Sequence, residues 1–339
     1  MKKPLVAIVI LNFNGKKFLQ KFLPSVLASS YENFKIIIAD NASADDSVSF
    51  LQQNFPAIEL ILLEKNFGFA EGYNQALARV EADYFVLLNS DVEVTKNWIE
   101  PIIQLMESDE KIAFCQPKIL SYKDEETFEY AGAAGGWLDV LGYPFARGRV
   151  FGVLEKDTNQ FPNSMNIFWA TGAAMFAKAA VYKQLGGFYA YLFAHQEEVD
   201  LCWRAQLAGY KIACCTQSAV YHVGGGTLPQ GHFRKTFFNF RNNLIMLSRN
   251  LLWREKVWKI PLRLTLDGVF AVKSILLGDF SSFKGVLYAH FAFYKWSFSR
   301  HKKQILPKKP MRSLNGVCRK WLIWQHFARG KKYFEDFFQ

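Results

Sequence analysis

Short apolar runs alternate with amphipathic stretches through the first 91 residues, and this alternation constrains the fold more than any other feature. The runs that predict buried strands are 5–11, 34–40, 58–64 and 84–91. The stretches with helical spacing are 15–29, 45–55 and 69–80. A strand–helix order at these lengths is typical of a parallel sheet with helices on both faces. The sequence therefore predicts an α/β fold with a mostly parallel sheet flanked by helices.

Polar residues follow each predicted strand, at the edge where parallel strands end. Sheets of this kind bind ligands beyond the carboxyl ends of their strands. The loops run from Asn12 to Gly15, Asp40 to Ser43, Asn66 to Gly68 and Asn89 to Asp91. A fold needs turns here, but four polar loops at one edge also make a site. The first strand is not followed by G-x-G-x-x-G, which argues against a dinucleotide-binding Rossmann enzyme.

Three of these side chains have both a chemical and a structural interpretation. Asp91, at a strand end, can hold a divalent ion that neutralises a diphosphate, or it can form a turn. Asp40 can accept hydrogen bonds from a base or a ribose, or it can close an N-terminal turn. His222 ends an apolar run before three glycines, so it can ligate a metal beside a close-lying ligand or serve the fold.

A late helix begins with three acids, in "HQEEVDLCWRAQLAGY" (195–210). Acids suit a helix N-terminus, where they meet the positive end of the dipole. Asp200 and Arg204 are four residues apart and can pair on one face. Glu198 is then free to point elsewhere, and a deprotonated Glu can act as a general base toward a substrate hydroxyl.

Charge divides the chain near residue 230. Residues 1–230 hold 19 Lys/Arg and 25 Asp/Glu, whereas residues 231–339 hold 22 and 5. The basic part has helical spacing and many aromatics, as at 234–256, 285–303 and 317–338. Interleaved Lys/Arg and aromatics are typical of a helix lying on anionic lipid, although a solvated helical appendage fits too. It contains no recognised nucleic-acid motif, so we expect no nucleic-acid partner.

Cysteine usage and hydropathy bear on location. The five cysteines are scattered without disulfide or metal spacing, which favours a reducing compartment. The first apolar run stops at Asn12 without a cleavage site, and no run of about 20 apolar residues follows. We therefore expect a cytoplasmic protein, peripheral at the inner face of the cytoplasmic membrane.

Seven segments in register resemble the family 2 glycosyltransferases, inverting enzymes with a GT-A fold, and most closely their rhamnosyltransferase-type branch. The segments are "VAIVILNFNG", "IIIADNASADDS", "NFGFAEGYNQAL", "LLNSDV", "TGAAMFAKAAVYKQLGGF", "EEVDLCWRAQLAGY" and "VYHVGG". The resemblance covers about residues 5–250. It implies a GT-A catalytic domain over 1–230, with a nucleotide-sugar half at about 1–110 and an acceptor half at about 111–230. Residues 231–339 form the basic helical C-terminal region.

The resemblance also implies a donor site. Asp40 is the candidate for contact with the nucleotide base, and Leu11 and Asn12 would line the nucleoside pocket. The family's Asp-x-Asp motif falls on Asn89-Ser90-Asp91, so only Asp91 supplies a carboxylate and Asn89 is at most a sugar or ribose contact. The expected ligands of a divalent ion, Mn²⁺ or Mg²⁺, are Asp91 and His222. Asn66 completes the expected donor contacts.

Catalysis and acceptor binding follow from the same resemblance. Glu198 is the expected base, with Glu197 as the alternative, in a single displacement that inverts the anomeric centre. The expected acceptor is a glycan or lipid-linked glycan of surface polysaccharide synthesis. Trp169 and Gly172, with the glycine-rich loop 132–149, are candidates to bound the sugar or acceptor, although core packing explains Trp169 as well. Two other hypotheses stay open: a member of the same fold that binds without turnover, and a basic nucleic-acid-binding protein.

Overall fold

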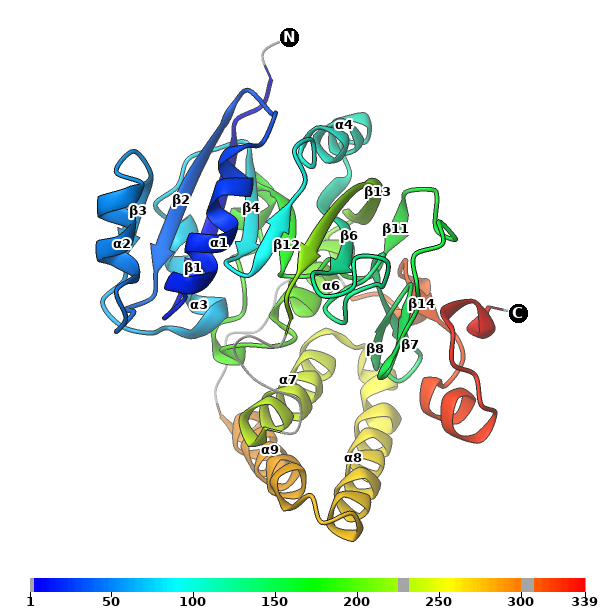
Figure 1. The fold of residues 1–339 in the computed structure, drawn as a ribbon. Helices are drawn as coiled ribbons and strands as arrows, with labels where there is room; N and C mark the ends of the chain where they lie inside the picture. Colours follow the sequence, from blue (N-terminus) through cyan, green and yellow to red (C-terminus); the bar gives the residue numbers. More distant parts are fainter. Residues whose placement is uncertain (1–2, 225–231, 300–307, 339) are drawn as a thin grey trace.

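The first half of the chain forms a parallel sheet covered by helices. The structure, a computed structural model, describes residues 3–224, 232–299 and 308–338. Its first strands are β1 (Val6–Asn12), β2 (Phe34–Asp40), β3 (Glu59–Leu62) and β4 (Tyr84–Asn89). β1 pairs in parallel with both β2 and β4, and β2 with β3. The connecting helices are α1 (Lys16–Leu27), α2 (Ser47–Asn54) and α3 (Gly68–Leu77) (Figure 1).

The second half extends the same sheet with mixed pairing. It adds the strands β5 (Val92–Val94), β6 (Ile112–Ser121), β11 (Met165–Ile167), β12 (Ala174–Lys178) and β13 (Lys211–His222). β12 runs antiparallel between β4 and β6, whereas β13 lies parallel to β6. The helices here are α4 (Glu100–Ser108), α5 (Ala179–Gln184) and α6 (Glu197–Leu207), with a 3₁₀ turn, η1 (Ala190–Leu192), before α6. The predicted α/β class is confirmed, and the parallel pairings of this central sheet join β1 to β2 and β4, β2 to β3, and β6 to β13.

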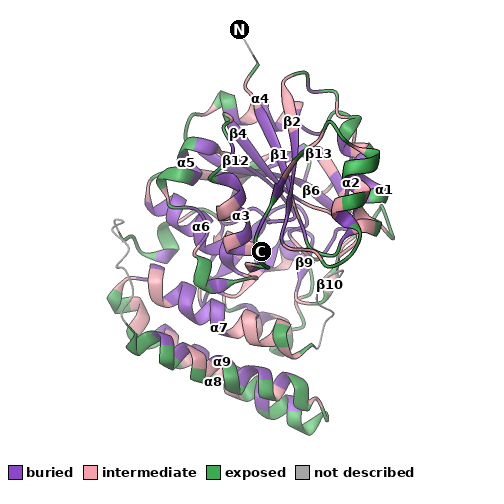
Figure 2. Cartoon of the chain, turned by 90° about the vertical axis from the view of Figure 1, so that its left-hand side faces the viewer, coloured by how far each residue is buried: buried purple, intermediate pink, exposed green. Residues whose placement is uncertain are grey.

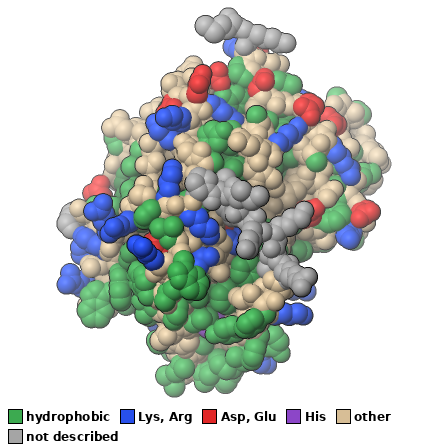
Figure 3. All heavy atoms as spheres, turned by 180° about the vertical axis from the view of Figure 1, so that it is seen from behind, with side chains coloured by type: hydrophobic (Ala, Val, Ile, Leu, Met, Phe, Trp, Pro, Cys, Tyr) green, Lys and Arg blue, Asp and Glu red, His purple; other side chains and the backbone are tan. Residues whose placement is uncertain are grey.

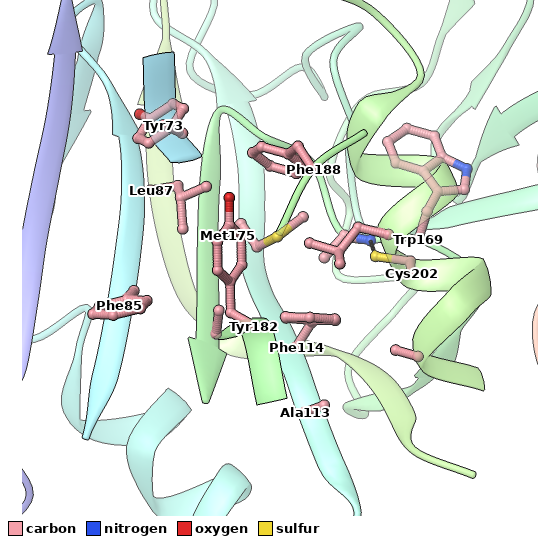
Figure 4. Packing of buried hydrophobic residues seen from close by; sticks show 14 of the residues in the cluster. Tyr73, Phe85, Leu87, Ala113, Phe114, Trp169, Met175, Tyr182, Phe188 and Cys202 are labelled. Atoms are coloured by element: carbon pink, nitrogen blue, oxygen red, sulfur yellow. Dashed lines mark hydrogen bonds between the residues drawn. The ribbon is translucent and has the colours of Figure 1, made fainter. Parts of the chain in front are cut away.

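Both faces of the sheet are buried, as alternating side chains along the strands require. Ala7 and Val9 join one buried cluster, and Ile8 and Ile10 join the other. Figure 4 shows part of the first cluster, where aromatic side chains from strands and helices meet across the sheet. A layer of helices on each face therefore fixes the sheet, and with it the loops at the strand ends.

A small second sheet adjoins the second half of the central sheet. It comprises β7 (Gly136–Asp139), β8 (Pro144–Ala146), β9 (Arg149–Val150), β10 (Val153–Leu154) and β14 (Val317–Cys318). β14 comes from the C-terminal tail and pairs in parallel with β7. The tail thus returns to the catalytic unit rather than ending as a separate appendage.

The helix predicted over 317–338 is wrong. After the 3₁₀ turn η2 (Met311–Ser313), the tail holds β14, a π-helical turn η3 (Trp324–Ala328) and a 3₁₀ turn η4 (Phe334–Phe337). Gly316 and Gly330 adopt positive φ angles of 70° and 68°, which interrupt a helix. Phe334 and Phe337 pack against the small sheet. The periodically spaced apolar residues of this segment are therefore buried against the small sheet, although the segment does not form a continuous helix.

Three helices follow the change in charge at residue 230. They are α7 (Phe233–Asn250), α8 (Trp253–Leu276) and α9 (Phe280–Phe298). In α7 the run from Leu244 to Leu247 is fully buried, and Met246 and Leu247 belong to the same cluster as the central sheet. The hydrophobic core therefore continues across the charge boundary. Helices α8 and α9 extend away from the sheet, with an exposed outer side (Figures 1 and 2).

Within the described ranges, we find no helix that is both long enough and apolar enough to span a bilayer. The expected helix over 285–303 corresponds to α9 as far as Phe298, and its last residues lie outside the described ranges. The second and third glycines after His222, Gly225 and Gly226, also lie outside them.

Candidate active site

The carboxyl ends of the central strands bring predicted donor residues side by side. Asn12 at the end of β1 is in register with Asp40 at the end of β2, and Leu11 is in register with Asn89 on β4. Asn12 Nδ2 donates to Asp40 Oδ1 at 2.9 Å, and both side chains are buried. The Asn12 Oδ1 atom is enclosed without a hydrogen-bond partner. The edge therefore holds the Asp40 carboxylate in a fixed position, whereas the Asn12 side-chain oxygen faces Gly15 and is closed off from solvent.

The loop after β2 holds the Asp40 carboxylate. Ser43 donates to it twice, from N to Oδ2 at 2.9 Å and from Oγ to Oδ1 at 2.6 Å. The Ser43 Oγ in turn accepts from the Asn14 backbone N–H at 2.9 Å. The loops after β1 and β2 are therefore tied together, and Asp40 has little rotational freedom.

Asn66 has a structural role in the loop after β3. Its Oδ1 accepts from Asn41 Nδ2 at 3.1 Å and from the Gly68 N–H at 2.8 Å. Asn41 also donates to the Gly68 carbonyl and accepts from the Phe67 N–H. These bonds close the loop at the N-terminus of α3, and they account for Asn66 without a ligand.

Leu11 and Asn89 lie opposite each other on β1 and β4, and their contact with a nucleoside stays a prediction. A Cβ on Gly72 of α3 would lie 3.0 Å from Leu11 Cδ2, so the glycine lets the helix approach this side chain closely. The backbone N–H of Asn89 donates to the Ala173 carbonyl at 3.0 Å, which ties β4 to the start of β12. Asn89 is partly exposed at the edge.

Asp91 and His222 meet although they are 131 residues apart. His222 Nε2 lies 3.1 Å from Asp91 Oδ1, and both residues are buried. On its other side, His222 Nδ1 lies 3.1 Å from Glu129 Oε2, within ion-pair distance but without hydrogen-bond alignment. Burial alone would lower the pKa of His222, but Asp91 and Glu129 outweigh it and raise the pKa to about 10.

Asp91 can supply a carboxylate oxygen to a divalent ion, and His222 can supply a ring nitrogen once its imidazole has lost the proton that Asp91 and Glu129 stabilise. A carboxylate oxygen and an imidazole nitrogen are both ligands for Mn²⁺-type ions, and a carboxylate behind the far ring nitrogen orients such a histidine. Among the described residues, no group of three or more His, Cys, Asp or Glu side chains is arranged to hold a metal. Asp91 and His222 alone supply two potential ligands, and their assignment to a divalent ion stays a prediction.

Glu197 and Glu198 begin α6, and each has an enclosed Oε2 atom without a hydrogen-bond partner. Burial raises the pKa of Glu198 to about 7, against the lowering effect of nearby backbone N–H groups. Burial, and after it the charge of Glu198, raises the pKa of Glu197 well above its ordinary value. Near neutral pH, Glu198 is the better proton acceptor of the two.

Asp200 has the structural role that its spacing predicts. Arg204 Nε donates to Asp200 Oδ2 at 2.8 Å, and Asn250 Nδ2 donates to Asp200 Oδ1 at 2.8 Å. Arg204 also donates to the carbonyls of Leu185 and Gly187 at 2.7 Å. The pair between Asp200 and Arg204 is confirmed, and it attaches α6 to the end of α5.

Trp169 lies in the core of this structure. It is 4% exposed, and its indole Nε1 donates to the Trp137 carbonyl at 3.1 Å. Figure 4 shows it beside Cys202 of α6. A Cβ on Gly172 would lie 3.0 Å from Phe69 Cζ, so this glycine permits close packing against α3. Core packing accounts for Trp169, and its role toward a sugar stays a prediction.

Sequence reasoning missed two residues of this site. Glu129 contacts His222, but it stands in an acidic stretch whose pattern does not single it out. Ser43 stands three residues after Asp40 in the segment "DNAS", where the sequence indicates only a polar loop and not a residue that binds the Asp40 carboxylate. The contact of Glu129 depends on the pairing of β13 with β6, which the local sequence does not specify.

Comparison with known proteins identifies the class of protein to which this fold, with its polar site at the carboxyl edge of the sheet, belongs. The model of the family described as "Glycosyl transferase family 2" matches residues 7–179, just over half of the chain. The chain belongs to this family and is a glycosyltransferase.

Among curated proteins, the N-acetylglucosaminyl-diphospho-decaprenol L-rhamnosyltransferase of Mycobacterium tuberculosis is 23% identical over 292 residues, covering 80% of this chain and 92% of that protein. A putative teichuronic acid biosynthesis glycosyltransferase of Bacillus subtilis is 32% identical over 107 residues, covering 31% of this chain and 42% of that protein. The rhamnosyltransferase-like resemblance is therefore supported over most of the chain.

Solved structures confirm the fold. GalNAc-T7 with UDP, GalNAc and Mn²⁺ aligns with a TM-score of 0.59 at 15% identity, over 74% of this chain and 48% of that one. A mannosyltransferase from Pyrobaculum calidifontis in complex with GDP-Man and Mn²⁺ aligns with a TM-score of 0.52 at 12% identity, over 88% and 89%. The central sheet and its helices are thus of the GT-A type.

Proposed function

We propose that this protein transfers a sugar from a nucleoside-diphosphate sugar to a hydroxyl of a glycan or lipid-linked glycan acceptor, with inversion at the anomeric carbon. One observation carries the proposal. Asp40 with Asn12, and Asp91 with His222, lie at strand ends, and the helix α6 begins with the buried Glu197 and the half-buried Glu198. Solved relatives of the same fold contain a nucleotide or nucleotide sugar with Mn²⁺.

The donor nucleoside lies at the edge between β1 and β2 in this proposal. Asp40 accepts a hydrogen bond from the base, and Asn12 holds the Asp40 carboxylate in place for this contact. Leu11 packs against the nucleoside, and Asn89 contacts the ribose or the sugar. Asp91 and His222 hold the divalent ion. When bound, this ion supplies positive charge that neutralises the diphosphate as it leaves.

Glu198 is the general base. Its carboxylate takes the proton from the acceptor hydroxyl while that oxygen forms a bond to the anomeric carbon. The bond from this carbon to the diphosphate oxygen breaks in the same step, and its electron pair leaves with the nucleoside diphosphate. Attack from the opposite face inverts the centre, and no enzyme nucleophile is needed. A pKa of about 7 lets Glu198 perform this step near neutral pH.

The test is release of nucleoside diphosphate from UDP-, dTDP-, GDP- and CDP-sugars, with N-acetylglucosamine linked to a short polyprenyl diphosphate as acceptor. We expect turnover with one donor, an inverted product by NMR, and a fall of about 10²–10⁴ in Glu198→Gln. Glu126→Gln, whose side chain is 77% exposed, is the matched control and should retain activity. Donor binding without any turnover would favour the non-catalytic alternative.

We also propose that helices α8 and α9 bind an anionic membrane surface, at the cytoplasmic face. Large apolar side chains are exposed at the turn between the two helices: Leu276 is 80% exposed, Leu277 72% and Phe280 59%. Residues 253–298 contain seven Lys/Arg and three Asp/Glu. Figure 3 shows hydrophobic side chains gathered at this end of the molecule, with basic side chains beside them. Such a surface suits lipid with negative headgroups.

This location would place the site beside a lipid-linked acceptor. In Figure 1, α7 to α9 lie on the side of the sheet toward which β1 and β2 point, which is the side of the donor edge. The five cysteines are buried and unpaired, as suits a reducing compartment.

Vesicle sedimentation tests the membrane proposal. We expect binding to vesicles that contain phosphatidylglycerol, weaker binding to phosphatidylcholine alone, and loss of binding in the triple variant Leu276→Ser, Leu277→Ser, Phe280→Ser. The control carries Leu27→Ser and Leu154→Ser, two exposed leucines on the catalytic unit. Equal binding by the triple variant and the control would refute the proposal.

A further inference from the structure

The segment that delivers Glu197 and Glu198 to the site has an unusual backbone. Between η1 and α6, the non-glycine residues Phe193, His195 and Gln196 have φ angles of 65°, 69° and 73°. Residues other than glycine rarely adopt this left-handed region, and they persist there only where the surroundings hold them. Gln196 is the residue directly before α6, and its side chain makes no capping hydrogen bond. Something outside the segment must therefore stabilise it.

Asn242 of α7 supplies that support. It is fully buried, and its Nδ2 atom lies at 2.8 Å from the Leu192 carbonyl, 2.8 Å from that of Ala194 and 2.7 Å from that of His195. An amide has two N–H donors, so at least one of these bonds is shared. A single side chain thus binds three of the four carbonyls from residue 192 to residue 195.

Arg241 fixes the orientation of the Asn242 amide. Arg241 Nε donates to Asn242 Oδ1 at 2.8 Å, which requires the oxygen on that side and leaves the NH₂ group facing the carbonyls. Arg241 also donates to the carbonyls of Tyr191 and Leu192, and its guanidinium lies over the rings of Phe237 and Phe238. The amide is therefore held rigidly, and no other orientation satisfies the same groups.

The same segment also contacts the donor half. The Phe193 carbonyl accepts from the backbone N–H groups of Phe69 and Ala70, at 2.8 and 3.0 Å, at the start of α3. The Phe193 ring stacks on Phe238 of α7, with centroids 5.4 Å apart. The left-handed conformation thus links the start of α3, the start of α6 and α7.

We propose that Asn242 is a positioning residue for the transfer reaction: by binding the carbonyls of residues 192, 194 and 195 it holds the positive φ angles of this segment and thereby sets where the Glu198 carboxylate stands. This inference rests on the proposed function, in which Glu198 is the base. It makes α7, from the basic part of the chain, a component of the catalytic apparatus.

Asn242→Ala and the milder Asn242→Ser test the proposal, with Asn250→Ala as the control. Asn250 is an equally buried asparagine of the same helix, and it binds Asp200 rather than the 192–195 segment. We expect Asn242→Ala to lower kcat by about 10²-fold with the donor KM within about twofold, since a small misplacement of a catalytic group has this cost. Asn242→Ser keeps one donor and should recover part of the loss.

Two further readouts separate positioning from general destabilisation. Hydrogen exchange should accelerate in amides 193–199 of the Asn242 variants and stay unchanged in β13. The acid limb of the pH–rate profile should move, because the surroundings of Glu198 change. Asn250→Ala should lower the melting temperature without either effect.

Each outcome decides the inference. Accelerated exchange in 193–199 together with lost kcat supports it. Full activity of Asn242→Ala while Glu198→Gln is inactive overturns the positioning role and leaves the proposed function intact. Unchanged exchange in 193–199 overturns it as well. If Glu198→Gln retains full activity, the base assignment fails, and the inference falls with it.

Discussion

At the scale of single residues, the acid pair at the start of α6 gives the sharpest chemical expectation. A base must be deprotonated to accept a proton, and burial places the pKa of Glu198 at about 7. We predict that kcat/KM for the acceptor falls about tenfold per pH unit below pH 7 and levels off above it. A pH–rate profile between pH 5 and 9 checks this. A flat profile across that range would exclude Glu198 as the base.

The burial of Glu198 also predicts that the unfolding free energy falls as pH rises, whereas the activity rises. The folded-state pKa of Glu198 is raised, so stability is fully present below the unfolded pKa of about 4.5 and is lost as pH rises through 7. Glu198→Gln removes this loss. We predict that the variant gains roughly 1–3 kcal/mol of unfolding free energy at pH 8 and little at pH 4. Urea unfolding at the two pH values measures the gain, and equal stability at pH 8 would refute the prediction.

The sequence indicated individual residues well where a short motif carried them. Asp40 and Asn12 follow strands whose parallel pairing could be predicted, and the structure brings them within 2.9 Å. His222 could be singled out by its neighbours, but its contact with Glu129 could not. That contact depends on a long-range strand register, whereas Trp169 shows that an aromatic in a family motif can serve the core.

At the scale of elements, the junction of α5 and α6 is fixed by a buried ion pair. Asp200 is fully buried, and the charges of Arg204 and Arg249 outweigh burial and hold its pKa below the ordinary value. We predict that Arg204→Ala lowers the unfolding free energy by about 3–5 kcal/mol, because a buried carboxylate loses its main partner.

The control for this prediction is Lys156→Ala, which breaks an exposed pair with Glu126 and should cost no more than about 1 kcal/mol. Urea unfolding of both variants makes the comparison. Similar losses in the two variants would contradict the role of Arg204 in joining α6 to α5.

Elements were predictable where local periodicity and tertiary packing agree. The strands and helices of the first 91 residues satisfy both conditions, and the Gly186-Gly187 end of α5 has the positive φ angles that its sequence implies. The segment 317–338 has the local periodicity of a helix, but its tertiary packing differs, because its apolar residues pack on a sheet that other parts of the chain form. Periodicity alone could not distinguish the two cases.

At the scale of the whole molecule, the C-terminal tail packs on the small sheet. Phe337 is 1% exposed and packs against Phe145 of β8, and the Leu322 N–H donates to the buried Asp139 carboxylate at 2.9 Å. We predict that Phe337→Ala costs about 3–5 kcal/mol of unfolding free energy. Phe327→Ala, at a position that is 64% exposed, should cost clearly less. Thermal unfolding of both variants checks this, and equal losses would mean that the tail does not stabilise the catalytic unit.

The net charge of the basic part predicted a change of partner at residue 230, but charge gave no information on packing. α7 carries four of those basic residues and still contributes Met246 and Leu247 to the central core. The exposed apolar surface is confined mainly to α8 and α9 within that part, a division that only the three-dimensional arrangement shows (Figure 2).

The measurement that tests the central proposal most directly is thermal stabilisation of the purified protein by UDP, dTDP, GDP and CDP, each with and without Mn²⁺. A ligand that binds only the folded state raises the melting temperature by mass action. We predict a shift with one nucleotide that is larger with Mn²⁺, and loss of the Mn²⁺-dependent part in Asp91→Asn but not in the exposed control Asp124→Asn. No shift with any nucleotide, or an undiminished shift in Asp91→Asn, would contradict a metal-assisted nucleotide-sugar site at this edge of the sheet.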